Sequence, residues 1–264
     1  MSYPVRTEVC YNTSHPSRGR ALLINYEHDR PGSVKDTKDV YHVLEKLQFA
    51  VTVATNLKER ELMDLLEKES KEDHTNSDCF VMVVMAHGTA PDMIKIMDGY
   101  FAMDRLWKDF VGNLCSSLKG KPKLFFIQSC RGNLEEKIQR KDAVPIIEKE
   151  ENFLVSMHAD LLVMYASYYK HAAYRDPTEG AWFIQALCNV LSGDIRQTDL
   201  LSLLTDVSYD VMYKYANRFA ENGIYNLQIP MITSMLTKKF YFVEKYVPAV
   251  KGSKDTRYNV LAGK

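Results

Sequence analysis

The sequence lacks an excess of charge of either sign and lacks a long hydrophobic run. Its 264 residues contain 34 Lys and Arg and 34 Asp and Glu. Because nucleic acids and anionic membrane surfaces attract surplus basic residues, this balance indicates neither of them as a partner. The apolar runs have the length of strands, whereas a membrane-spanning helix needs about 20 apolar residues. Residues 1–18 also lack the apolar core of a signal peptide.

Cysteines are few and do not occur in pairs. The five are Cys10, Cys79, Cys115, Cys130 and Cys188. An odd, scattered set without Cys-x-x-Cys spacing predicts neither a disulfide framework nor a zinc site. A chain that is 46% hydrophobic can form a core without disulfides. We therefore expect a cytoplasmic protein that holds no metal and no cofactor.

Strand and helix patterns alternate along the first half of the chain. We predict strands at 21–25, 49–54, 80–86 and 125–128, and helices that begin near residues 32, 56 and 104. The first helix shows the i, i+3, i+4, i+7 spacing at Val40, Val43, Leu44 and Leu47. This order predicts an α/β fold with a mostly parallel sheet and helices on both faces.

A charge-dense stretch, residues 133–156, separates this half from the rest, and we interpret it as an exposed linker. Beyond it we predict a strand at 161–166, helices at 178–191 and 198–219, and strands at 227–236 and 240–243. The polar tail after residue 247 is expected to be mobile. The chain thus divides into 1–18, 19–132, 133–156, 157–246 and 247–264.

A cysteine and a histidine follow two of the predicted strands. Cys130 comes after the strand at 125–128, and His87 comes after the strand at 80–86. Sites in open α/β sheets lie beyond the carboxyl ends of the strands, so this placement brings a thiol and an imidazole together. Such a pair can generate the thiolate that attacks a carbonyl carbon. A lone cysteine is more often a small core residue, which is our interpretation of the other four. A metal site at His87 is a remote alternative, because no second ligand has suitable spacing.

The segment Gln128-Ser129-Cys130-Arg131-Gly132, with His87 43 residues before the cysteine, resembles the signature of the caspase family. Three further segments resemble the family in the same order, Gly19–Asn25, Ala181–Gln185 and Gln228–Pro230. The likeness runs from about Tyr11 to Tyr246. It implies a three-layer caspase-like fold with a six-stranded, mostly parallel sheet.

The resemblance also implies an activity, cleavage of peptide bonds after aspartate, in apoptosis-type signalling. Cys130 would be the nucleophile, and His87 would protonate the leaving amine. The backbone N–H groups of Gly88 and Cys130 would form the oxyanion hole, since a glycine allows close approach.

Six further residues match the substrate-binding positions of the family. Arg30, Gln128 and Arg175 would hold the aspartate, because a guanidinium binds a carboxylate through two parallel hydrogen bonds. Ala173 would pair with the substrate backbone, and Tyr174 and Trp182 would shape the upstream subsites. Taken alone, each arginine is more often a solvated surface charge, and Trp182 on a helix is a candidate for core packing. Arg30 requires a shorter loop than is usual in the family.

The implied partners are protein substrates with exposed aspartates and a second chain. The strand at 229–236 would pair with its copy in a homodimer or with a related caspase, because an unpaired apolar edge strand invites association. The protein would be a zymogen, yet Asp142 follows Gln139-Arg140-Lys141, a poor sequence for self-cleavage. From the short segment before the core we expect no recruitment domain.

Departures from the family pattern motivate a second hypothesis. Ser129 stands where alanine is usual, Ala86 and Thr89 flank His87-Gly88, and the loop Ser167–Ala172 is altered. The alternative function is a catalytically weak homologue, or decoy, that regulates an active caspase by heterodimerisation.

Overall fold

The computed structural model describes residues 9–89, 92–132, 134, 136–139, 158–216, 224–245 and 259–262. Its strands are β1 (Arg20–Asn25), β2 (Ala50–Thr55), β3 (Phe80–Met85), β4 (Gly88–Thr89), β5 (Met93–Ile96), β6 (Gly99–Ala102), β7 (Lys123–Gln128), β8 (Glu136–Gln139), β9 (Leu161–Tyr165), β10 (Arg175–Asp176), β11 (Gly180–Ala181), β12 (Ile224–Leu227), β13 (Met231–Ser234) and β14 (Asn259–Ala262). Its helices are α1 (Ser33–Lys46), α2 (Glu59–Ser70), α3 (Trp182–Leu191) and α4 (Leu200–Tyr209).

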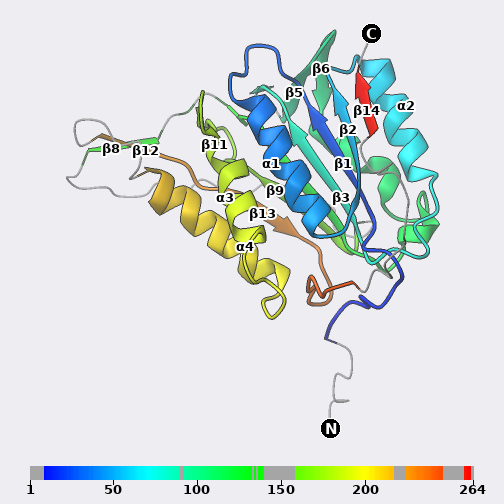
Figure 1. The fold of residues 1–264 in the computed structure, drawn as a ribbon. Coiled ribbons are helices and arrows are strands. Elements are labelled where there is room, and N and C mark those ends of the chain that lie inside the picture. Colours follow the sequence, from blue (N-terminus) through cyan, green and yellow to red (C-terminus); the bar gives the residue numbers. More distant parts are fainter. Residues whose placement is uncertain are drawn as a thin grey trace, which may run out of the picture.

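One large sheet organises these elements, in the order β13-β9-β7-β3-β1-β2-β14 (Figure 1). All neighbours run parallel except β13, which is antiparallel to β9. Six of the seven strands predicted from the sequence lie in this sheet, at least in part, and the mostly parallel α/β fold is confirmed. The seventh strand of the sheet, β14, comes from the tail that we expected to be mobile, and its four residues pair with β2. Among the described residues, no helix is long and apolar enough to cross a membrane.

The strands are buried on both faces, which is why they appear in the sequence as continuous apolar runs. Leu23 and Val83 point to a core shared with α1, α3 and α4. Their neighbours Leu22 and Val84 point to a second core shared with α2. Figure 1 shows α1 and α3 on one side of the sheet and α2 on the other. The predicted three-layer arrangement follows from this two-sided burial.

The helix expected at 104–118 is instead a series of short 3-10 turns, Met103–Leu106, Lys108–Phe110 and Ser116–Leu118. The backbone leaves the helical region at Val111 (φ −108°, ψ 160°) and turns at Gly112 (φ 62°). Tertiary packing still places the apolar residues as expected, because the rings of Phe110 and Phe80 stack at 4.6 Å. Periodicity alone could not distinguish these turns from one continuous helix.

Predicted elements of the second half differ at their ends. Of the strand expected at 227–236, only Met231–Ser234 forms a strand of the large sheet, β13; it begins after Pro230, which has no N–H to donate, and residue 227 ends β12. The residues 240–243 form no strand, although Phe240 and Phe242 are buried. Helix α3 begins at Trp182 rather than Thr178, because the β10–β11 hairpin precedes it. Residues 136–139 of the expected linker pair with β12, and Asp142 lies outside the described residues.

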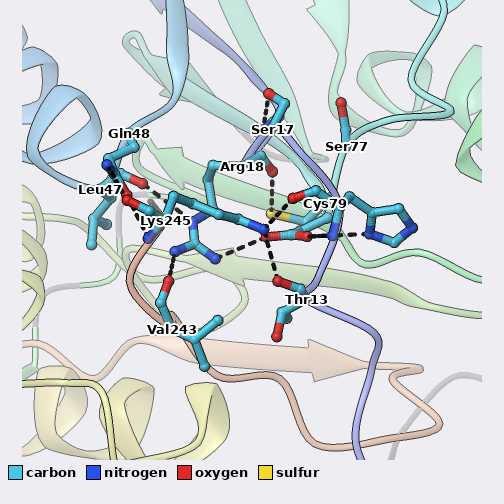
Figure 2. Close-up of polar contacts among 12 residues, drawn as sticks. Thr13, Ser17, Arg18, Leu47, Gln48, Ser77, Cys79, Val243 and Lys245 are labelled. Atoms are coloured by element: carbon cyan, nitrogen blue, oxygen red, sulfur yellow. Dashed lines mark hydrogen bonds and ion pairs between the residues drawn. The ribbon is translucent and has the colours of Figure 1, made fainter. Parts of the chain in front are cut away.

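A buried ionic cluster joins the two ends of the described core, near the start of β1 and β3. We call it the Asp78 cluster, because one carboxylate accepts bonds from Arg18 (3.0 Å), Lys245 (2.6 Å) and His15 (3.2 Å). Figure 2 shows Arg18 and Lys245 converging, with the side chain of Gln48 beside them. Gln48 also bonds the backbone of Lys245 in both directions, at 2.9 and 3.0 Å. The cluster therefore fastens the chain near residue 245 to the first strand.

Candidate active site

The register of β3 and β7 places the predicted histidine and cysteine side by side. Met85 pairs with Gln128, and the Ala86 N–H donates to the Gln128 carbonyl at 3.0 Å. His87 and Cys130 each follow two residues after this pair, at the same edge of the sheet. The predicted juxtaposition therefore results from parallel pairing of two buried strands.

Gly88 lies directly against the backbone of the cysteine. A Cβ at position 88 would lie 1.8 Å from the Cys130 carbonyl oxygen, far inside any allowed contact. The sequence analysis attributed this glycine to the approach of a substrate oxygen. The structure adds a reason within the chain itself, because only glycine lets these two segments touch.

His87 is held through one of its ring nitrogens. Its Nε2 lies 3.1 Å from the carbonyl oxygen of Asp29. A carbonyl can only accept, so Nε2 carries the hydrogen and Nδ1 is the basic nitrogen of the neutral ring. Burial lowers the pKa of His87, and the charges of Arg30 and Arg175 lower it further. The imidazole is therefore neutral near pH 7 and can accept a proton at Nδ1.

Cys130 is the one cysteine in this setting. Its half-buried Sγ accepts the N–H of Ala173 at 3.3 Å and lies 3.7 Å from the carbonyl oxygen of the same residue. Cys79 and Cys188 are deeply buried, and burial raises the pKa of both thiols. All five cysteines are free thiols in this structure.

Two guanidinium groups lie near each other beside Cys130. The Nη1 of Arg30 donates to Asn25 Oδ1 (2.8 Å) and to the carbonyl oxygen of Tyr26 (2.9 Å). Burial lowers the pKa of Arg30 to about 10, and the charge of Arg175 contributes to the decrease. Arg175 is half-buried, with its Nη2 3.5 Å from the Asp29 carbonyl oxygen. The short loop before Arg30 thus does not prevent the two arginines from lying together.

Unsatisfied polar atoms mark this part of the site. The Nη2 of Arg30 and the Oε1 of Gln128 are buried, and no described residue offers them a hydrogen-bond partner. Buried polar atoms without partners are rare in native proteins and need an explanation. A bound acidic ligand would supply an acceptor for Arg30, which is the chemistry predicted for this residue.

The rings of the two predicted aromatic residues pack against each other at a tilt. The centroids of Tyr174 and Trp182 lie 5.0 Å apart, and the ring of Tyr215 stacks on Trp182 at 6.3 Å. Trp182 is only 4% exposed, which agrees with the alternative of core packing. Its contact with a substrate stays a prediction. The Tyr174 N–H is fixed by the side chain of Gln228 at 2.6 Å.

Sequence reasoning missed three contributors to the site. Asp29 acts through its carbonyl oxygen, which any residue supplies, so its side chain gave no signal. Gln228 was quoted for the family resemblance but received no role. Asp36, a buried carboxylate in the first turn of α1, is electrostatically coupled to both arginines. Asp36 and Arg175 are far apart in the sequence, so this coupling could not be predicted from it.

The loop after the nucleophile is fixed by a buried arginine. Arg131 forms two parallel hydrogen bonds with Asp92, at 2.7 and 2.9 Å. Its guanidinium also lies over the ring of Tyr165, 4.0 Å from the centroid. No cluster of three metal-ligating side chains occurs within the described part of the chain, so the alternative of a metal at His87 gains no support.

Comparison with known proteins agrees with this architecture and with the motif. The family model of the caspase domain, Peptidase_C14, matches residues 18–241. The chain belongs to the caspase family, a family of cysteine proteases in apoptotic signalling.

Insect and vertebrate relatives span nearly the whole chain. Caspase-1 of Spodoptera frugiperda is 34% identical over 245 residues, 89% of this chain and 82% of the relative. Caspase drICE of Drosophila melanogaster is 32% identical over 247 residues, 89% of this chain and 73% of the relative. The crystal structure of the Spodoptera caspase-1 superimposes with a TM-score of 0.78, covering 92% of this chain and 97% of that chain.

Proposed function

We propose that this chain is a cytoplasmic endopeptidase that cleaves protein substrates after aspartate, in apoptosis-type signalling. The observation that carries the proposal is the pair of guanidinium groups beside a half-buried thiol, one of them with a buried, unpartnered donor. Two neighbouring cations are unfavourable unless an anion joins them. The side chain of aspartate is such an anion, and its carboxylate matches the donor geometry of arginine.

The proposed reaction begins at the sulfur of Cys130. Nδ1 of His87 removes the thiol proton, and the thiolate attacks the backbone carbonyl carbon of the bound aspartate residue. Nδ1–H then donates this proton to the leaving amine as the C–N bond breaks, which leaves a thioester on the sulfur. Nδ1 next takes a proton from water, whose oxygen attacks the thioester. Cleavage of the C–S bond releases the product carboxyl group, and Nδ1–H returns its proton to the departing sulfur, which restores the thiol and the neutral imidazole.

The negative oxygen formed in each attack needs hydrogen-bond donors. The backbone N–H groups of Gly88 and Cys130 are the proposed pair, because both segments lie against each other at the end of the strands. The donor held by Asp29 keeps the imidazole in the tautomer that this sequence of steps requires.

The experiment is cleavage of an acetylated tetrapeptide reporter ending in aspartate, compared with the same reporter ending in asparagine. We expect turnover of the first only, and no turnover by Cys130→Ala. Cys10→Ala is the matched control, since that cysteine is exposed, lies opposite Lys239 outside the site, and should leave cleavage intact. Equal cleavage of both reporters would contradict the specificity, and cleavage by Cys130→Ala would contradict the mechanism.

A second candidate function rests on the outer strand β13. Among the described residues β13 is an edge strand of the large sheet, paired with β9 on one side, and Ile229 next to it is 40% exposed. Through this edge the chain would form a homodimer, or would bind a related caspase and regulate it while cleaving little itself. Absence of turnover, together with altered activity of an added caspase, would favour this regulator over the protease.

A further inference from the structure

Asp36 lies in the first turn of α1 and is completely buried. Both of its carboxylate oxygens accept the N–H of Ala181, at 3.1 and 3.0 Å, and Oδ1 also accepts Nε2 of Gln185 at 3.0 Å. Ala181 belongs to β11 and Gln185 to α3. The carboxylate therefore fastens α1 to the hairpin β10–β11, and that hairpin carries Arg175.

The hairpin is shaped around this carboxylate. Gly180 has φ +99°, a conformation that side chains rarely adopt, and a Cβ there would lie 2.1 Å from Asp36 Oδ1. Only glycine lets the hairpin come this close. The close approach and the three hydrogen bonds together make Asp36 a fixed point between the two segments.

The same carboxylate is coupled to the two arginines of the site. Burial raises the pKa of Asp36 to about 6, while its hydrogen bonds and the charges of Arg30 and Arg175 oppose the increase. Arg30 precedes α1, and Arg175 begins β10. The titratable and charged side chains around Asp36 are Arg30, Lys35, Asp39, Arg175 and Cys188. Only the two arginines belong to the proposed aspartate pocket.

We propose that Asp36 is a positioning residue of the arginine pocket, which holds the hairpin in place and is the counter-ion of both guanidinium groups until the substrate carboxylate arrives. The inference rests on the proposed function, in which these arginines bind aspartate. It adds that the pocket contains an internal carboxylate, which competes electrostatically with the substrate for the same two cations.

Two substitutions separate the two roles. In Asp36→Asn the remaining Oδ1 can still accept from Ala181 and Gln185, so the hairpin stays fastened while the negative charge disappears. The arginines then attract the substrate carboxylate without competition, and affinity rises. In Asp36→Ala both the charge and the fastening are lost, so affinity falls below that of the asparagine variant.

Acidification should imitate the loss of charge. A bound substrate carboxylate raises the proton affinity of Asp36, so protonation of Asp36 and binding of the substrate favour each other. Affinity for an aspartate peptide should therefore rise as the pH falls from 7.5 to 5.5, where the peptide itself is still ionised. His87 also gains a proton in this range, but it does so equally in Asp36→Asn, so the difference between the two proteins reports Asp36.

The experiment uses the full chain with Cys130→Ala, which removes turnover, and calorimetric titration with an acetylated tetrapeptide amide ending in aspartate. At pH 7.5 we expect Asp36→Asn to bind about fivefold more tightly than its parent. The advantage should shrink as the pH falls to 5.5, because the parent then loses the same charge. Asp36→Ala should bind about tenfold more weakly than Asp36→Asn. Asp39→Asn is the matched control, since Asp39 shares Gln185 but not the arginines, and should bind like the parent.

A purely structural carboxylate would give weaker binding in both Asp36 variants and the same pH dependence in all proteins, and that result would overturn the inference. Equal binding by Asp36→Asn and its parent at every pH would do the same. If Asp36→Ala does not fold, the pH comparison of the asparagine variant still decides. A parent that binds peptides ending in aspartate and in asparagine equally well would instead refute the proposed function, and the inference with it.

Discussion

The Asp78 cluster offers a quantitative test of how the two ends of the core are joined. Asp78 is fully buried, and it faces Arg18, which is 2% exposed, and Lys245, which is 8% exposed. In Asp78→Ala these two cations remain buried without their carboxylate. Removing one partner from a buried ionic group costs about 3–5 kcal/mol, so we expect the free energy of unfolding to fall by that amount.

Part of this loss can be assigned to individual contacts. Lys245 also donates to the carbonyl oxygens of Thr13 and His15, both at 2.7 Å, and these acceptors are untouched in Asp78→Ala. Arg18 keeps its bonds to the carbonyl oxygens of Leu47 and Val243. These remaining bonds limit the decrease in the free energy of unfolding, whereas the uncompensated charges of Arg18 and Lys245 determine its size. For a chain of this size the expected cost lowers the unfolding temperature by roughly 6–20 °C.

The assay is equilibrium urea denaturation under reducing conditions, followed by tryptophan fluorescence. The two tryptophans report different cores, because Trp107 packs on the side of α2 and Trp182 on the side of α1. The matched control is Asp64→Ala, which removes an exposed ion pair with Arg60 at 4.0 Å and should leave stability unchanged. A loss below about 1 kcal/mol in Asp78→Ala would refute the reasoning, since a buried carboxylate among cations would then contribute no more than a surface pair.

Three further predictions concern the site. Ser129→Ala removes a buried hydroxyl that has no partner among the described residues. The free energy of unfolding, measured by urea denaturation, should therefore stay the same or rise by about 1–2 kcal/mol. Clear destabilisation would reveal a hydrogen bond of this hydroxyl. Gly88→Ala forces a methyl group against the Cys130 carbonyl oxygen. Reporter cleavage should therefore fall, and the free energy of unfolding should decrease by at least about 2 kcal/mol. A fully active variant would show that the backbone can shift freely. Because the pKa of His87 is lowered and the neutral ring is the form that takes the thiol proton, kcat/KM should decline with acidification only below about pH 6.5; an acid limb centred above that value would contradict a neutral His87 at pH 7.

Much of the site could be predicted because its signals are local. The segment around Cys130 and the strand before His87 are short and strongly patterned, and both strands are buried on two faces. Arg30 and Arg175 needed the family resemblance, since nothing in the residues around an arginine says where its guanidinium points. The structure places the two close enough for the charge of Arg175 to contribute to the lowered pKa of Arg30.

Other features depend on contacts between distant segments. The carbonyl oxygen that holds His87 belongs to Asp29, and the donor that contacts Cys130 belongs to Ala173. Backbone groups are the same in every residue, so no pattern could identify them. The 3-10 turns at 103–118 have the apolar spacing of a helix, and only the packing around Phe110 and the turn at Gly112 distinguish them.

By itself the sequence determined most strands of the parallel sheet, the edge of the sheet where thiol and imidazole meet, and the family. These features depend on burial and on periodicity, and both can be recognised from residues that are close together in the sequence. Tertiary structure alone decided that Asp36 is electrostatically coupled to two arginines, that Asp78 contacts Arg18, Lys245 and His15, and that residues 259–262 add a strand to β2. A charge acquires its effect from the distance to other charges, and that distance exists only once the chain has folded.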